Sequence, residues 1–253
     1  DPVLHRLGLH GYAVIPLMLS LGCNVPGILS TRVLESKRER FIASTLISIG
    51  IPCVPLQAMI FGLLGAYGGF YVIGVYLVLF TLIITLGFIM NKLLKGFSPE
   101  FVLEIPPYRI PPASILFKKL YFRIKGFIFE AVPVVLLGVL VINILLYFDI
   151  LNLITGFFAP LVTGLFGLPK EAVISLAIGF LRKDVAVGML LPLGLNAKQL
   201  FIAATLLAVS FPCVATFVVI WKELGTRYLF KATLIMVSVS IIVGTLLNLI
   251  IVF

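Results

Sequence analysis

Long apolar runs alternate with short polar or proline-containing stretches along the whole chain. Two uninterrupted runs, at about 70–91 and 127–148, are each long enough to cross a bilayer as a helix. The other runs lie at about 11–31, 41–66, 150–168, 171–191, 198–222 and 228–253. The pattern predicts an all-α polytopic membrane protein, with about seven or eight membrane segments in one domain, residues 1–253.

Two of the early apolar runs contain residues that interrupt a helix. The first holds Gly22-Cys23-Asn24-Val25-Pro26, and the second holds Pro52-Cys53-Val54-Pro55. Proline removes a backbone donor, and irregular backbone at membrane depth must be buried in protein or line a wet cavity. We therefore expect broken helices whose thiol and amide groups can face a permeating ion. The alternative is a proline kink beside a buried cysteine that acts as a small hydrophobe.

Composition and charge support a membrane location. The chain is 61% hydrophobic and 11% charged, with a mean hydropathy of +1.23, whereas soluble domains are about 25% charged. The 19 basic residues outnumber the 10 acidic ones and lie between apolar runs, which fits the positive-inside rule better than a nucleic-acid partner. The three cysteines all lie in apolar segments, so they form neither a disulfide framework nor a zinc motif. The first run lacks a basic leader and does not resemble a signal peptide.

The segment at about 92–125 is the one long stretch without membrane character. Its four central prolines forbid a helix through its middle, and basic residues then alternate with aromatic and aliphatic ones up to residue 125. This pattern predicts an amphipathic helix on the cytoplasmic membrane surface.

The chain contains an internal repeat. Residues 41–54 match residues 201–214 at eight of fourteen positions, including the Pro-Cys-Val sequence, and the same offset sets Cys23-Asn24 opposite Lys183-Asp184. The loop 31–40 holds four basic residues, but its counterpart 191–200 holds only Lys198. Since basic loops stay cytoplasmic, we expect two repeats of opposite orientation, at about 8–66 and 167–226, with the substrate site between their broken helices.

The repeat predicts which side chains converge at that site. They are Cys23, Asn24, Cys53, Lys183, Asp184 and Cys213. Soft thiolates combined with harder oxygen ligands suit a divalent transition ion such as ferrous iron better than potassium or calcium. Ionisable residues beside an apolar run indicate function, although Lys183 and Asp184 could instead form a local pair, with the lysine reaching toward the interface.

Several motifs, in order along nearly the whole chain, resemble the membrane permease of the ferrous iron transporter B family. They are the Gate-type segment at 22–40, residues 104–111, Lys183-Asp184 with Val187-Gly188, and residues 212–216. The resemblance implies transport of Fe²⁺, as substrate and not as a permanently bound cofactor, across the cytoplasmic (inner) membrane of a bacterium or archaeon. By motif position it gives Cys23, Cys53 and Cys213 a role in iron passage.

The chain also departs from the family pattern. Asp184 stands where the family has glutamate, the segment 52–57 lacks the arginine usual there, and no G-x-x-x-x-G-K-[ST] phosphate loop is present. We therefore expect no enzymatic activity in these residues, and a permease fragment or subunit whose GTP-binding domain is fused upstream or is a separate chain. The expected partners are Fe²⁺, that GTP-binding domain and the lipid bilayer, and no nucleic acid is expected. Whether the chain forms a homo-oligomer stays open.

Other functions remain open from sequence. A nucleoside or other organic-solute transporter with Gate-type repeats is the runner-up, with Asn24 and Gln57 as its thin support. A membrane assembly protein without transport activity would tolerate replacement of the cysteines. An intramembrane enzyme fits least, because His5 and His10 both lie at the N-terminus and no acids are paired at catalytic spacing.

Overall fold

The computed structural model describes residues 2–94, 112–147, 160, 162–181, 183–210 and 212–250. Over these ranges the regular structure is helical. Four helical segments are long and apolar enough to cross a membrane: Lys37–Tyr67, Gly69–Leu93, Ala197–Leu224 and Thr226–Ile250. The predicted all-α polytopic membrane fold is confirmed; most of the expected run at 150–168 lies outside the described residues.

Short helices precede the long ones in both halves of the chain. The helices of the first half are α1 (Pro2–Arg6), α2 (Val14–Ser20), α3 (Asn24–Ser30), α4 (Lys37–Gly50), α5 (Val54–Met59), α6 (Gly69–Leu93) and α7 (Ala113–Tyr147). Those of the second half are α9 (Glu171–Leu181), α10 (Lys183–Leu190), α11 (Ala197–Val209), α12 (Val214–Leu224) and α13 (Thr226–Ile250). A π-helical turn over Ile60–Leu64 and a 3₁₀ turn over Gly65–Tyr67 join α5 to α6.

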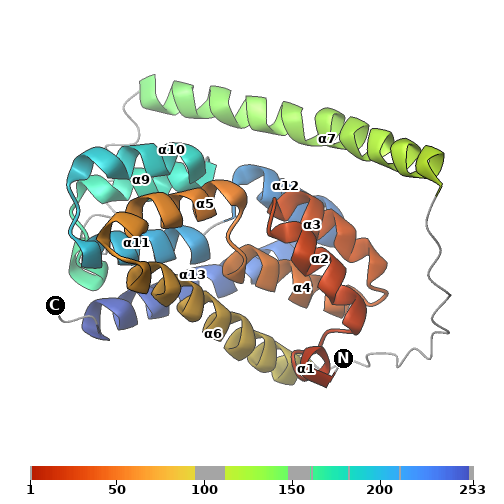
Figure 1. Ribbon diagram of the computed structural model, residues 1–253, viewed down its shortest axis with the longest axis horizontal. Helices are drawn as coiled ribbons and strands as arrows, with labels where there is room; N and C mark the ends of the chain where they lie inside the picture. The colour runs from red at the N-terminus through yellow and green to blue at the C-terminus, as the bar shows by residue number, and fades with distance from the viewer. Residues whose placement is uncertain are drawn as a thin grey trace.

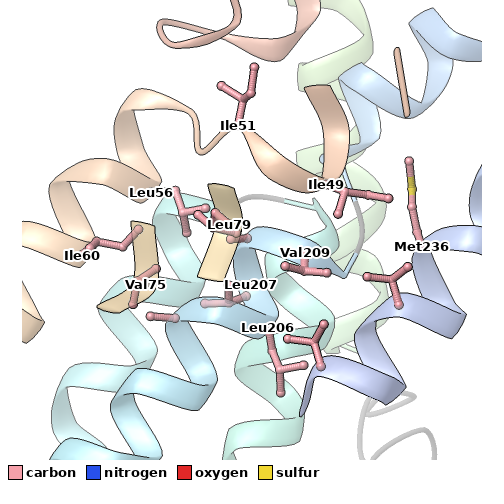
Figure 2. Close-up of a cluster of buried hydrophobic side chains, with 14 of the residues drawn as sticks. Ile49, Ile51, Leu56, Ile60, Val75, Leu79, Leu206, Leu207, Val209 and Met236 are labelled. Atoms are coloured by element: carbon pink, nitrogen blue, oxygen red, sulfur yellow. The ribbon is translucent and has the colours of Figure 1, made fainter. Parts of the chain in front are cut away.

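Each half places a broken helix in the core and an unbroken helix beside it (Figure 1). The broken helices are the more buried ones. In the most apolar part of each segment, 56% is buried in α4–α5 and 59% in α11–α12, but only 28% is buried in each of the unbroken helices α6 and α13. Figure 2 shows where the halves meet: Leu56 and Leu79 from the first half lie near Leu207 and Val209 from the second. Close van der Waals packing of this kind holds membrane helices together, because lipid gives little hydrophobic driving force.

The two halves use matching anchors at their outer helices. Gly8, with φ +74°, and Gly167, with φ +65°, both lie where a Cβ would come within 2.6–2.7 Å of an asparagine side chain, that of Asn91 in α6 and that of Asn248 in α13. The Asn91 Nδ2 donates to the Arg6 carbonyl at the end of α1 at 3.1 Å, and the Asn248 Nδ2 donates to the Leu165 carbonyl, also at 3.1 Å. Only glycine allows this approach with a positive φ.

A second pair of matching contacts ties the same outer helices to the central ones. The guanidinium of Arg38 at the start of α4 donates to the Asn91 carbonyl at 3.0 Å, and the ammonium of Lys198 at the start of α11 donates to the Asn248 carbonyl at 3.1 Å. These cations neutralise the carbonyl ends of α6 and α13, where the helix dipole is negative. The similarity of the halves therefore extends through α6 and α13, beyond residues 66 and 226. The direction in which each half crosses the membrane stays a prediction.

The structure joins two segments of the sequence in α7. The end of the expected amphipathic segment, up to residue 125, and the apolar run from about 127 form one continuous helix over Ala113–Tyr147 that lies along one side of the bundle (Figure 1). The surface location of the first part stays a prediction. Gly126 and Pro133 both fall inside α7. Proline removes one backbone hydrogen bond and glycine costs about 1 kcal/mol, so neither ends a helix whose flanking turns are strongly apolar. Residues 95–111 of the expected amphipathic segment lie outside the described residues.

Candidate functional site

Each of the three cysteines caps the start of a helix that follows a break. Cys23 precedes α3, Cys53 precedes α5 and Cys213 precedes α12, all with extended backbone. All three are free thiols and half-buried. Pro52 and Pro212 lie directly before two of them. Proline cannot donate to the preceding helical turn, so α4 and α11 end and a new helix begins after the cysteine.

The two breaks of the first half are joined by backbone and side-chain hydrogen bonds. The Val54 N–H donates to the Gly22 carbonyl at 3.1 Å. The side-chain Nε2 of Gln57 donates to the Leu21 carbonyl at 2.9 Å and to the Pro52 carbonyl at 2.8 Å. Carbonyls left free at a helix break need partners when they are removed from water. Gln57 supplies them, and so holds the Cys23 break against the Cys53 break.

The breaks of the second half carry a buried cation. Lys183 is the first residue of α10, and its side chain is only 6% exposed. Its ammonium donates to the Ala208 carbonyl in the last turn of α11 at 3.5 Å. Nearby, the Cys213 sulfur lies 3.1 Å from the Thr216 hydroxyl oxygen. The second half therefore places an ammonium, a thiol and a helix-end carbonyl together.

Electrostatic interactions link the two halves at this point. Cys23 interacts with both Cys53 and Cys213, and Lys183 interacts with Cys53 and Cys213. Cys23 and Lys183 are thus each within electrostatic range of both Cys53 and Cys213. These four residues stand at the starts of α3, α5, α10 and α12, that is, in both repeats.

Asn24 and Asp184 follow Cys23 and Lys183 in sequence. Asn24 is 6% exposed, and its side-chain oxygen has no hydrogen-bond partner among the described residues. A buried acceptor without a partner is costly, which is typical of a group that meets a ligand or water. Asp184 belongs to α10, but its side chain lies outside the part of the structure that is described.

The cysteines do not form a ready-made metal centre. In the described ranges, no three His, Cys, Asp or Glu side chains are grouped closely enough to hold a metal ion. A structural zinc site has four ligands already in place, whereas a site that an ion passes through must bind it weakly enough to release it. The arrangement can offer soft sulfur ligands one or two at a time, beside amide and carbonyl oxygens.

Sequence reasoning missed two contributors to this geometry. Gln57 was considered only as a ligand for an organic solute, yet it bridges carbonyls of the two breaks. A lone amide inside an apolar run is a signal that could have identified it. The Ala208 carbonyl, which accepts from Lys183, carries no sequence signal because every residue has a carbonyl.

Comparison with protein families agrees with this architecture. The Gate family, described as Nucleoside recognition, matches residues 1–67 and 128–227, well over half of the chain, and the family described as Ferrous iron transport protein B C terminus matches residues 72–123. The chain belongs to the ferrous iron transport protein B (FeoB) family. The Gate matches contain the cysteines of both repeats, and the FeoB match covers most of α6 and the beginning of α7.

Individual FeoB relatives cover nearly the whole chain. The Fe(2+) transporter FeoB of Methanocaldococcus jannaschii is 28% identical over 96% of this chain, and that of Staphylococcus aureus strain COL is 27% identical over 98%. A fusion of Fe(2+) transport protein A with FeoB from Porphyromonas gingivalis is 33% identical over 58% of the chain. The chain spans 42% and 41% of the length of the first two relatives. No solved structure matches the chain.

Proposed function

We propose that this chain is the membrane permease of a ferrous iron transporter, and that Fe²⁺ passes between its two repeats. One observation carries the proposal: a free cysteine stands at the start of the helix after each of three breaks, and the Cys23 and Cys53 breaks are hydrogen-bonded to each other, from the Val54 N–H to the Gly22 carbonyl at 3.1 Å. Packing alone gives no reason for thiols at all three breaks. Sulfur ligands favour a late first-row divalent ion over the alkali and alkaline-earth ions.

In this proposal the cysteines, the amide and the carboxylate have different roles. Cys23, Cys53 and Cys213 bind the ion in turn, and Asn24 adds a harder oxygen ligand. Asp184 offsets the positive charge that arrives with the ion. The family resemblance further supports a cytoplasmic membrane location and a GTP-binding domain as partner, with nucleotide hydrolysis outside these residues.

Cobalt(II) tests the proposed metal site directly. Purified in detergent under reducing conditions, the full chain should show a sulfur-to-cobalt charge-transfer absorption, because a thiolate bound to cobalt gives such a band. The band should weaken at low pH, since a thiol must lose its proton to bind metal. Cys23→Ser and Cys213→Ser should each reduce the band at least tenfold while the helical content by circular dichroism is unchanged.

A relocated thiol provides the matched control. Ser238 is exposed on α13, so Ser238→Cys in the Cys23→Ser, Cys213→Ser background restores the number of thiols without restoring the site. It should not restore the band. A wild-type cobalt spectrum without a sulfur contribution, or full iron uptake by cells whose transporter carries both serine substitutions, would refute the proposal. Saturable nucleoside binding at this site would instead support the organic-solute alternative.

A further inference from the structure

The burial of Lys183 calls for a physical explanation. Its side chain is 6% exposed, and it starts α10, where the helix dipole is positive and a cation is disfavoured. Among the described residues its hydrogen-bond partner is the Ala208 carbonyl at 3.5 Å, longer than the roughly 2.7–3.2 Å of a good N–H···O bond. A buried charge normally has a close partner.

The surroundings of the ammonium form a site for a cation. Ala208 lies in the last turn of α11, where backbone carbonyls lack helical partners and the dipole is negative. The thiols of Cys53 and Cys213 are within electrostatic range of the same ammonium. Carbonyl oxygen and sulfur are also ligands for a divalent transition ion.

The first repeat shows what the site is like without this charge. Cys23 occupies the position equivalent to Lys183, and Ser48 the position equivalent to Ala208, at the offset of 160 residues that relates the two Pro-Cys sequences. The Ser48 hydroxyl donates to the Ser44 carbonyl of its own helix at 2.8 Å. The ammonium therefore belongs to one repeat only, and the matching helix framework does not require it.

We propose that the Lys183 ammonium is the resident cation of the proposed iron path, held between Cys53, Cys213 and the end of α11 until a divalent ion displaces it. This inference rests on the proposed function and adds a selectivity device to it. In this exchange the side chain moves aside, and no covalent bond to it forms or breaks. It is a positioning residue and not a ligand.

The resident charge has two consequences for transport. An arriving ion must compete with an ammonium that is already in place, so a monovalent ion that binds sulfur weakly gains nothing by entering. A divalent ion that does bind remains beside a positive charge, which weakens its binding and favours release. This matches the requirement that a passing ion be bound only moderately.

The test is a gain of cobalt affinity in variants whose helical content by circular dichroism is that of wild type. In cobalt titrations of the purified full chain at fixed pH and ionic strength, Lys183→Met should half-saturate the sulfur-to-cobalt band at an at least tenfold lower cobalt concentration than wild type. Charges a few ångströms apart inside a protein interact strongly enough for such a change. Lys183→Gln, whose amide can still donate to Ala208, should behave alike, while Lys183→Arg, which keeps the charge, should stay within about twofold of wild type.

Lys170→Met is the matched control, because Lys170 is exposed and lies just before α9. It should leave the titration unchanged. The inference is overturned if folded Lys183→Met and Lys183→Gln bind cobalt no more tightly than wild type, or if Lys183→Arg binds as tightly as they do. The sulfur band of wild type would then still support the proposed function. Absence of that band in wild type would overturn both.

A second measurement needs no variant. Reductive methylation of wild-type lysines, read by mass spectrometry, should modify Lys183 slowly without cobalt and several-fold faster with cobalt bound, because the displaced ammonium leaves its buried position. Lys170 should react equally in both conditions. Equal protection of Lys183 with and without bound cobalt would contradict displacement.

Discussion

Gln57 and Phe217 occupy equivalent positions in the two repeats, four residues after the Pro-Cys cysteine, yet they hold their helix breaks together by different interactions. Gln57 donates hydrogen bonds to carbonyls of both breaks in the first repeat. The Phe217 ring packs edge-on against Phe180 at the end of α9, with ring centroids 5.9 Å apart. A directional polar contact in one repeat is replaced by an aromatic contact in the other.

This difference separates the framework from the site. The framework of the two repeats is shared, as the anchors at Asn91 and Asn248 show. The residues at the equivalent breaks differ, because Cys23 and Asn24 in the first repeat align with Lys183 and Asp184 in the second. The ion path that we propose between the repeats would therefore be neutral on one side and charged on the other. Three pairs of substitutions outside the cysteines test how far the difference goes.

The largest effect is expected where α2 packs on α3. A Cβ on Gly27 would overlap the Ser20 side chain and lie 3.1 Å from the Ser20 Cα, and Ser20 is fully buried with its hydroxyl donating to the Pro16 carbonyl at 2.6 Å. Gly27→Ala should therefore destabilise the fold by about 3 kcal/mol, the upper end for overpacking. Thermal unfolding in detergent, followed by circular dichroism, measures the loss.

The second repeat offers the matched control for this substitution. Gly188 lies in α10, and a Cβ there meets nothing within 4 Å. Gly188→Ala should stabilise its helix by up to about 1 kcal/mol, because alanine is the better helix former. Equal melting temperatures for the two alanine variants would show that the α2–α3 contact is not as tight as described.

A middle-sized effect is expected at Gln57. Gln57→Leu keeps the volume but leaves the carbonyls of Leu21 and Pro52 without that donor, which should cost about 2 kcal/mol. Phe217→Leu removes only the aromatic contact and should cost about 1 kcal/mol. The ratio of the two losses, from thermal or denaturant unfolding, measures the comparison directly. If Phe217→Leu is the more damaging change, the polar link does not hold the first repeat.

The smallest effect is expected at an ion pair between the repeats. The Arg32 guanidinium, after α3, binds both carboxylate oxygens of Glu223 in the last turn of α12, with Nε 2.9 Å from Oε2. The Arg32 side chain is 63% exposed, so solvent screens the pair. Arg32→Gln should cost about 0.5 kcal/mol, and less at high salt. Lys92→Gln, at an exposed lysine of α6, is the control and should leave the stability unchanged. A loss above 2 kcal/mol for Arg32→Gln would mean that this ion pair contributes strongly to the association of the two repeats.

Local chemistry made much of the fold predictable. The breaks before Cys53 and Cys213 follow from Pro52 and Pro212, whose missing N–H ends a helix in any context. The apolar runs that became α6 and α13 were long enough to predict helices without knowledge of their neighbours. At α7 local chemistry is less decisive: Gly126 and Pro133 favour a break locally, but strongly apolar turns on both sides continue the helix through them.

The sequence by itself determined that the chain forms membrane helices, where they break, and which side chains stand at each break, because backbone chemistry and hydrophobic length act over a few residues. The tertiary structure decided that Gln57 reaches the Leu21 carbonyl, that asparagines clamp Gly8 and Gly167, and that the Lys183 ammonium lies beside the Ala208 carbonyl. These contacts join segments 25 to 86 residues apart, or occupy carbonyls that every residue carries. Only the packing of whole helices brings such groups within hydrogen-bonding distance, so no local sequence pattern predicts these contacts.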